Sequence, residues 1–132
     1  MNTGVDWRFW QASVIYWSPH LYDWTVRLLY GREHTDNLRH IGQMIEPGSS
    51  VVDLCCGTAM LYRHVLRDKN VDYRGLDINP RFTSYLHSQG IAVDIADVMQ
   101  ISLPSADYLV MRSSYYHFGP DPTLLNRMRA AA

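Results

Sequence analysis

The chain has 132 residues, of which 47% are hydrophobic and 19% charged, and its formal net charge is −1. This length suits one globular domain with a core of its own. A charge so close to zero argues against a nucleic-acid partner, because binding to a phosphate backbone needs an excess of basic side chains. No apolar run reaches the ~20 residues of a membrane helix, and the N-terminus lacks the regions of a signal peptide, so we expect no membrane attachment.

The two cysteines, Cys55 and Cys56, are neighbours in the sequence. A disulfide between adjacent cysteines is strained, and neither has another cysteine to pair with. Unpaired cysteines are typical of a reducing compartment, so we expect a cytoplasmic protein. The absence of a Cys-x-x-Cys motif or a histidine cluster predicts no metal site.

Residues 1–46 are rich in aromatic side chains and are predicted to form an N-terminal helical cap. Ser18 followed by Pro19 is typical of a helix start, and this first helix should end near Gly31. A second helix is predicted at 35–45 from its apolar periodicity. The apolar residues that fit these helices are Leu21, Trp24, Val26, Leu28 and Leu29 in the first, and Leu38, Ile41, Met44 and Ile45 in the second.

Residues 47–132 alternate between short apolar runs and helical patterns, which is typical of an α/β fold with βαβ units and a parallel sheet. Right-handed crossovers place the helices over the faces of that sheet. Ligands of such folds bind beyond the carboxyl ends of the strands. Strands are predicted at 50–54, 72–78, 91–95 and 107–112, and helices at 59–67, from 79–80 to about 89, and from 121–122 to the end of the chain.

Each predicted strand ends in residues that can contact a ligand. The first is followed by the tight turn 53–59, where small residues allow a ligand to approach the backbone. The second ends at Asp77, whose carboxylate can accept hydrogen bonds from both ribose hydroxyls of an adenosine. The third is followed by Asp97, which can accept from an adenine amino group, and the fourth by a polar and aromatic loop, 112–118.

The run Asp53-Leu54-Cys55-Cys56-Gly57-Thr58 resembles the nucleotide loop of class I S-adenosylmethionine-dependent methyltransferases. Its Cys-Cys form is similar to that of the ubiquinone and menaquinone biosynthesis methyltransferases. Gly75-Leu76-Asp77-Ile78-Asn79-Pro80, the Asp97 step and the aromatic-histidine loop match the later motifs in order and spacing. The resemblance, from about residue 38 to 118, implies a Rossmann-like three-layer sandwich with strand order 3-2-1-4 and S-adenosylmethionine as cofactor.

The resemblance also implies a role for each matching residue. Asp53 would orient the loop and reach the amino group of the cofactor through water, and the backbone of Cys55, Gly57 and Thr58 would line its methionine portion. The family's turn prefers glycine at the places that Cys55 and Ala59 hold here, which leaves Gly57 as the one glycine of the turn.

The other strand ends would hold the adenosine and the sulfonium. The resemblance implies that Asp77 binds the ribose and Ile78 packs on the adenine, and that Asp97 and Val98 hold the adenine edge. Residues 112–113 would lie under the sulfonium end.

The predicted cofactor-binding set therefore also includes Arg112 and Ser113, together with Tyr22, the best candidate in the N-terminal segment to touch the carboxylate end of the cofactor. His117 is the candidate catalytic base, because a histidine can take a proton from a hydroxyl or amine acceptor near neutral pH. Methyl transfer depends chiefly on positioning and on exclusion of water. A second interpretation, in which His117 shapes the acceptor pocket, therefore stays open.

The function that we predict is methyl transfer to a small-molecule acceptor, and two alternatives stay open. One is a nicotinamide-dependent oxidoreductase. The last glycine of the Gly-x-Gly-x-x-Gly motif of that class would fall on Met60, which argues against this alternative. The other is a methyltransferase-like module that binds the cofactor or a partner without turnover, because fold alone does not establish catalysis.

The resemblance implies that the chain is C-terminally short, because the family has a seven-stranded sheet and four strands are predicted here. Residues 47–132 would then be the cofactor-binding part of a single domain. The predicted strand at 107–112 would leave an exposed apolar sheet edge, which is an aggregation hazard. We expect either a fragment of a longer gene or a second copy of the chain covering that edge.

Overall fold

A computed structural model describes residues 16–112 and 122–132 of the chain. Within these ranges a four-stranded parallel sheet has the order β3-β2-β1-β4, which confirms the predicted order 3-2-1-4. The elements in chain order are the α-helix α2 (Pro19–Met44), β1 (Ser50–Leu54), the π-helix η2 (Tyr62–Leu66), the 3-10 helix η3 (Arg67–Lys69), β2 (Asp72–Asp77), the α-helix α3 (Pro80–Ser88), β3 (Val93–Ile95), β4 (Tyr108–Met111) and the α-helix α4 (Thr123–Ala131).

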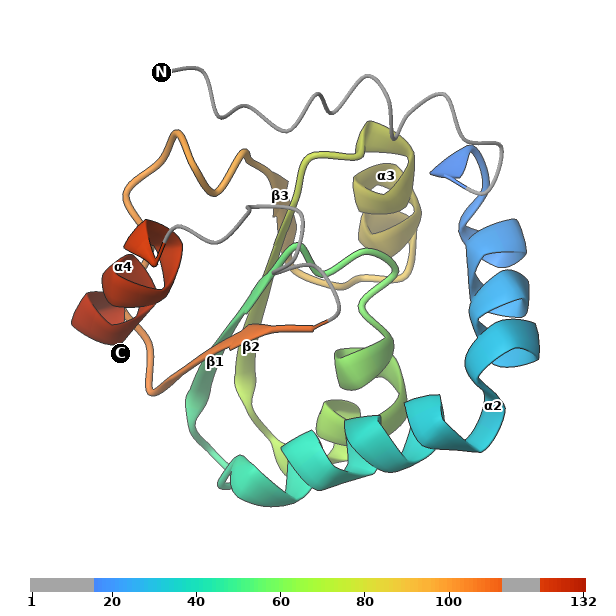
Figure 1. Ribbon diagram of the computed structural model, residues 1–132, viewed down its shortest axis with the longest axis horizontal. Coiled ribbons are helices and arrows are strands. Elements are labelled where there is room, and N and C mark those ends of the chain that lie inside the picture. The colour runs from blue at the N-terminus through green and yellow to red at the C-terminus, as the bar shows by residue number, and fades with distance from the viewer. Residues whose placement is uncertain (1–15, 113–121) are drawn as a thin grey trace.

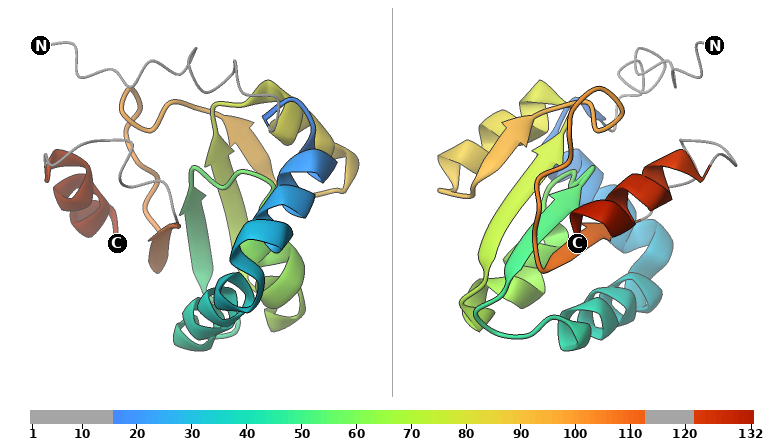
Figure 2. Two further views of the ribbon diagram at one scale, coloured as in Figure 1. Left: turned by 45° about the vertical axis from the view of Figure 1, so that its right-hand side comes forward. Right: turned by 90° about the vertical axis from the view of Figure 1, so that its left-hand side faces the viewer.

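The sheet is the middle layer of a three-layer sandwich, with α2, η2 and α3 on one face and α4 on the other (Figures 1 and 2). Side chains alternate between the two faces along each strand, as the pleat requires. Val51 of β1 belongs to the core cluster on the first face, which includes Leu38 and Leu86. The next residue, Val52, belongs to the cluster on the second face, which includes Leu124. The Rossmann-like class is therefore confirmed for the described residues.

The two helices predicted in the N-terminal part run on as one element, α2, with a kink at Gly31. Gly31 has φ 45° and ψ −121°, a conformation that glycine adopts far more readily than other residues. The start was predicted correctly, because Ser18 accepts a hydrogen bond from the Leu21 N–H and Pro19 holds the first helical position. The predicted gap between the helices at 32–34 is wrong, since the helix resumes immediately after the kink.

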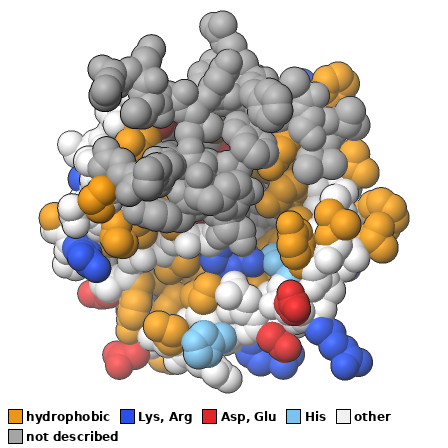
Figure 3. All heavy atoms as spheres, viewed as in Figure 1, with side chains coloured by type: hydrophobic (Ala, Val, Ile, Leu, Met, Phe, Trp, Pro, Cys, Tyr) orange, Lys and Arg blue, Asp and Glu red, His pale blue; other side chains and the backbone are white. Residues whose placement is uncertain are grey.

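Not all apolar residues of α2 face the core as predicted. Leu38 and Ile45 are buried, whereas Met44 is 63% exposed. Trp24 and Leu28 are also exposed, so the predicted helical face is only partly a core face. Figure 3 shows hydrophobic side chains over the N-terminal half of α2, along the right-hand side of the view. Tyr22 and Val26 are the residues of this half that pack against the core cluster.

The helix predicted at 59–67 differs in kind from the structure. Its middle, Tyr62–Leu66, is a π-helix, and Arg67–Lys69 is a 3-10 turn that ends at Asn70 in the left-handed region. Its apolar residues face the core, since Leu61 and Leu66 are buried and Val65 packs against the same cluster. A π-helix has no sequence period that distinguishes it from an α-helix over one or two turns.

The remaining boundaries shift by one or two residues from those predicted, as is usual for ends of elements. The third strand starts at Val93 rather than at residue 91, and the fourth spans Tyr108–Met111. The last helix begins at Thr123, after Pro122 as its N-cap residue. None of the helices within 16–112 and 122–132 has the length and apolar character that a membrane span requires.

Candidate functional site

The carboxyl ends of β1, β2 and β3 meet at one edge of the sheet because the strands are parallel. At this edge the loop after β1 crosses back towards β2, and the Cys56 N–H donates to the Leu76 carbonyl over 3.1 Å. The Ala96 N–H, after β3, donates to the Asp77 carbonyl over 3.0 Å. The predicted cofactor-binding residues at the ends of β1, β2 and β3 therefore lie close together.

The turn after β1 places every second residue in the left-handed region. Cys55, Gly57 and Ala59 have φ of 54°, 57° and 53°. This conformation is open to glycine and costs other residues roughly 1–2 kcal/mol each. The glycine preference of the resembled family at positions 55 and 59 thus has a backbone reason, and this chain adopts the same turn with Cys and Ala.

Asp77, the last residue of β2, binds the turn directly. Its two carboxylate oxygens accept the backbone N–H of Gly57 and of Asn79, each over 2.8 Å. Burial raises the pKa of Asp77, and backbone donors, Asn79 foremost, act in the opposite direction. The next residue, Ile78, is 37% exposed, so its side chain is free to contact a ligand.

Asp53 lies beneath the turn, on β1, and is 4% exposed. Its carboxyl group accepts a hydrogen bond of 2.8 Å from the hydroxyl of Tyr73 on β2. Burial raises the pKa of Asp53 to about 7, against the opposing effect of this hydrogen bond and of the Arg112 charge.

The thiols of the turn are half-buried, and their pKa values are raised, which favours the protonated form. Burial, together with the neighbouring carboxylates of Asp77, Asp53 and Asp97, raises the pKa of Cys55 to about 12. Burial also raises the pKa of Cys56. No group of three or more His, Cys, Asp and Glu side chains within 16–112 and 122–132 is arranged to hold a metal ion.

After β3, the two predicted residues are placed differently. Asp97 accepts the backbone N–H of Met99 over 2.9 Å, which closes a turn at the strand end. The side chain of Val98 is 2% exposed and belongs to the second core cluster, so only its backbone can meet a ligand.

Tyr22 of α2 lies over the turn. A Cβ atom added at Gly57 would be 3.8 Å from the Tyr22 hydroxyl, and the Tyr22 ring packs on Phe82 of α3 with a centroid distance of 5.1 Å. Burial raises the pKa of this hydroxyl, and Asp77 and Arg112 are among the charges that act on it. Tyr22 therefore lies next to Gly57 of the turn, with its ring against α3.

Asp23 joins α2 to the same turn, and the sequence analysis did not single it out. Its carboxylate accepts from the Thr58 hydroxyl over 2.5 Å and from Arg63 Nη1 over 2.8 Å. Arg63 also donates to the Thr58 carbonyl over 3.1 Å. The sequence contained one signal for this contact. Asp23 is an acidic residue between the core-facing residues Tyr22 and Val26, and an acidic side chain that faces a core needs a polar partner there.

Arg112 follows β4 and also contacts α2. Its Nε donates to Asn37 Oδ1 over 3.0 Å, and its Nη2 lies 2.8 Å from His34 Nδ1. Neither His34 nor Asn37 was predicted, since their partner is 75 or more residues away in the sequence. The predicted residues Ser113 and His117 lie outside the described residues.

The comparisons with known proteins agree with this geometry. The profile of the methionine biosynthesis protein MetW family matches residues 35–122, which is more than half of the chain. The chain belongs to this family. No curated protein matches the chain. The MetW match contains all four strands and the residues Asp53, Asp77 and Arg112, whereas Tyr22 and Asp23 precede it.

Several solved structures similar to this MetW-family chain are named as SAM-dependent methyltransferases, and others as cyclopropane synthases. A SAM-dependent methyltransferase from Geobacter sulfurreducens, in complex with S-adenosyl-L-homocysteine, has a TM-score of 0.59 and 19% identity over 73% of this chain and 43% of that one. A TehB-like SAM-dependent methyltransferase from Corynebacterium glutamicum has a TM-score of 0.58 and 21% identity over 72% and 53%. The mycolic acid cyclopropane synthase CmaA1, complexed with SAH, has a TM-score of 0.64 and 16% identity over 79% and 40%.

These likenesses show that the chain has the fold of class I S-adenosylmethionine-dependent methyltransferases. The chain spans between 40% and 53% of the length of these three solved structures.

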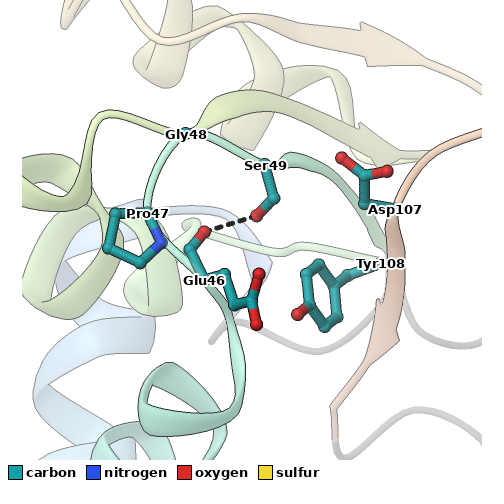
Figure 4. A pocket seen from close by; sticks show the side chains of 6 residues that line it. All are labelled: Glu46, Pro47, Gly48, Ser49, Asp107 and Tyr108. Carbon is teal, nitrogen blue, oxygen red and sulfur yellow. Dashed lines mark hydrogen bonds between the residues drawn. The ribbon is translucent and has the colours of Figure 1, made fainter.

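A surface pocket of this MetW-family chain lies at the opposite edge of the sheet, where β1 and β4 begin (Figure 4). There the Ser49 hydroxyl donates to the Glu46 carbonyl over 2.6 Å. Asp107 accepts the Ser50 N–H over 2.8 Å, so its carboxylate is engaged by the sheet. Because ligands of parallel α/β sheets bind beyond the carboxyl ends of the strands, this pocket is not part of the candidate site.

Proposed function

We propose that the chain binds S-adenosylmethionine at the carboxyl ends of β1, β2 and β3 and takes part in methyl transfer to a small-molecule acceptor. Residues 16–46 act in this proposal as a helical cap over a cofactor-binding part that begins at residue 47. The observation that carries the proposal is the pair of 2.8 Å hydrogen bonds from the backbone of Gly57 and Asn79 to the carboxylate of Asp77.

The residues at this edge suit an adenosyl ligand. A carboxylate at the end of the second strand, bound to the turn after the first, is the group that such sheets offer to a ribose. Each oxygen of Asp77 uses one of its two lone pairs for a backbone N–H, which leaves the second for a ribose hydroxyl. Ile78, exposed beside it, can pack on the adenine, while Asp97 and the backbone of Val98 lie at the adjacent strand end.

The turn suits the other end of the cofactor. Left-handed residues at 55, 57 and 59 turn the chain sharply between β1 and the following helix, and the small side chains allow close approach to the backbone. In this proposal Cys55, Gly57 and Thr58 line the methionine portion, and Tyr22 covers it. The buried Asp53 orients the turn and, in its ionised form, attracts the ammonium group through water.

S-adenosylmethionine, when bound, supplies a methyl group on a positively charged sulfur. The residues of this chain would then position the methyl group and exclude water, which are the main contributions to an in-line displacement. The helix α2 contributes to that exclusion, because Asp23 holds it on the turn through Thr58. We keep His117 as the candidate base for an acceptor that must lose a proton.

Calorimetric titration with S-adenosylhomocysteine and, separately, with NAD tests the ligand class. We expect heat with the first and none with the second. Asp77→Asn should weaken S-adenosylhomocysteine binding by on the order of tenfold or more, because it removes a charged hydrogen-bond acceptor. Asp72→Asn is the matched control, since Asp72 is an exposed residue at the other end of the same strand.

Binding of NAD alone, or of neither ligand, would contradict the proposal. A methyl-release assay over a panel of small-molecule acceptors then distinguishes an enzyme from a module without turnover. Binding without methyl release from any acceptor would favour the second.

A further inference from the structure

Arg112 is a half-buried cation whose partners are both neutral groups. Asn37 Oδ1 accepts from Nε, and His34 Nδ1 lies 2.8 Å from Nη2. Burial lowers the pKa of Arg112, and yet an arginine stays protonated in a protein. The guanidinium therefore brings a full positive charge to the carboxyl end of β4.

His34 is held as the neutral ring that this contact needs. Burial lowers the pKa of His34, and the Arg112 charge lowers it further. Its other nitrogen, Nε2, lies 2.9 Å from the sulfur of Met60, a buried residue just after the turn. With the proton on Nε2 pointing at that sulfur, the lone pair on Nδ1 faces Arg112. His34 and Asn37 thus fix the direction of the guanidinium without cancelling its charge.

Within 16–112 and 122–132, no carboxylate forms a salt bridge with Arg112. Asp53 is the acid whose charge acts most on it, and that carboxyl group is bound to the Tyr73 hydroxyl. A desolvated charge without a partner is unfavourable, and an anionic ligand would remove that cost.

The shape of the guanidinium favours a carboxylate as that anion. Nε and Nη2 form one edge of the planar group, and α2 holds this edge. The other edge, made by Nη1 and Nη2, has the two parallel N–H groups that match a carboxylate. A cation next to this edge would be repelled, whereas an anion would be attracted.

We propose that Arg112, positioned by His34 and Asn37 of α2, binds a carboxylate group of the ligand. The inference rests on the proposed function of the site. Two sources have this chemistry: the carboxylate of the methionine end of the cofactor, and a carboxylate on the methyl acceptor. His34 and Asn37 are positioning residues, since they act through Arg112.

The test measures the affinity of the full chain for two adenosyl ligands. One is S-adenosylhomocysteine, and the other is its decarboxylated analogue, which keeps the ammonium group and lacks the carboxylate. Succinate, titrated into the chain saturated with S-adenosylhomocysteine, probes a carboxylate site for the acceptor. All titrations are repeated with Arg112→Gln and Asn37→Asp.

Asn37→Asp places a carboxylate next to Arg112 Nε, which lies 3.0 Å from Asn37 Oδ1 in the wild type. The positive charge of Arg112 is then cancelled, although its side chain is kept. This variant carries the test if Arg112→Gln does not fold. Arg39→Gln is the matched control, because Arg39 lies on the same helix, is 68% exposed and pairs with Asp36 at 3.9 Å.

If the cofactor supplies the carboxylate, both variants lose about 10- to 100-fold in affinity for S-adenosylhomocysteine and nothing for the decarboxylated analogue. If the acceptor supplies it, S-adenosylhomocysteine binding is unchanged and the binding of succinate, present in the wild type, is lost. Either result supports the inference, and Arg39→Gln should show neither.

Equal losses for both adenosyl ligands would overturn the inference, because Arg112 would then act on the structure of the site and not on a carboxylate. Unchanged binding of all three probes would also overturn it. A wild-type chain that binds no adenosyl ligand would instead remove the proposed function itself, and the inference with it.

Discussion

The hydroxyl of Tyr73 on β2 donates a hydrogen bond of 2.8 Å to the buried carboxyl group of Asp53 on β1. This bond opposes the effect of burial, which dominates and raises the pKa of Asp53 to about 7. In an unfolded chain the pKa of an aspartate is about 3.9. The folded chain therefore keeps a proton on Asp53 over a pH range in which the unfolded chain has lost it.

This difference predicts how stability depends on pH. Between about pH 4 and 7 the folded state binds more protons than the unfolded state, so the contribution of Asp53 to the free energy of unfolding falls as pH rises. The fall approaches about 1.4 kcal/mol per pH unit and levels off above about pH 7. Urea denaturation of the wild type and of Asp53→Asn, compared at each pH, measures this contribution. A difference that does not change with pH would contradict the prediction.

Tyr73→Phe removes the donor from the same pair. We expect a loss of about 1–3 kcal/mol in the free energy of unfolding at pH 7, because a buried acceptor is left without its partner. The pKa of Asp53 should rise further, so the pH at which the slope levels off moves upward. Denaturation of this variant over the same pH series checks both effects. If the pH at which the slope levels off does not change, the hydrogen bond does not act on the pKa of Asp53.

Asp23 offers a prediction about the attachment of α2 to the turn. Its ion pair with Arg63 spans 2.8 Å and its side chain is 16% exposed. Asp23→Asn should lower the free energy of unfolding by about 3 kcal/mol, because Arg63 would be left half-buried without a counter-charge. Asp36→Asn breaks an exposed pair of the same helix and should cost no more than about 0.5 kcal/mol. Thermal denaturation of both variants tests this, and equal losses would contradict it.

Gly42 allows α2 to approach the helix that contains η2. A Cβ atom added at Gly42 would lie 2.1 Å from Cγ1 of Val65. Gly42→Ala should therefore lower the free energy of unfolding by about 2 kcal/mol through overpacking. In the double variant with Val65→Ala, the loss should be smaller than the sum of the two single losses, since the clashing atom is gone. Additive losses would mean that the cost arises elsewhere.

Gly57 differs from Gly42 because its surroundings have room for a side chain. A Cβ atom there would meet Tyr22 at an ordinary distance of 3.8 Å, so Gly57→Ala should cost only the left-handed backbone, about 1–2 kcal/mol. Cys55→Gly relieves the same backbone cost at φ 54° and should not lower the free energy of unfolding. Chemical denaturation of both variants measures the contrast, and a similar loss in each would favour packing over backbone conformation as the cause.

The sequence predicted the sheet well because each strand has a strong local signal. An apolar run such as 50–54, bounded by turn residues, has few other ways to bury itself. The helix starts at Ser18-Pro19 and Asn79-Pro80 were also predicted correctly, since the capping side chain and the proline are adjacent in the sequence. The placement of Asp77 and Gly57 at the same end of the sheet followed from the rule that ligands bind beyond the carboxyl ends of parallel strands, whereas the hydrogen bond between them was not predicted.

The parts that sequence reasoning missed depend on contacts between distant segments. His34 and Arg112 are 78 residues apart, and no local pattern in either stretch indicates that they meet. The exposure of Trp24 and Met44 was missed because apolar periodicity indicates a helix without saying how much of its surface is covered. The π-helix at Tyr62–Leu66 was missed because its periodicity over five residues resembles that of an α-helix.

The kink at Gly31 divides α2 into two parts that both pack on the core, the first through Tyr22 and Val26 and the second through Leu38. Only the first part carries Asp23, which accepts a hydrogen bond from Thr58 in the turn. Amide protons of the two parts should therefore exchange with solvent at separate rates, because local opening follows units that share contacts. Hydrogen exchange of Asp23→Asn should show faster exchange for residues 19–30 and unchanged exchange for 35–44. The half of α2 that covers the candidate site would then open without the half that follows the kink, although both belong to one helix.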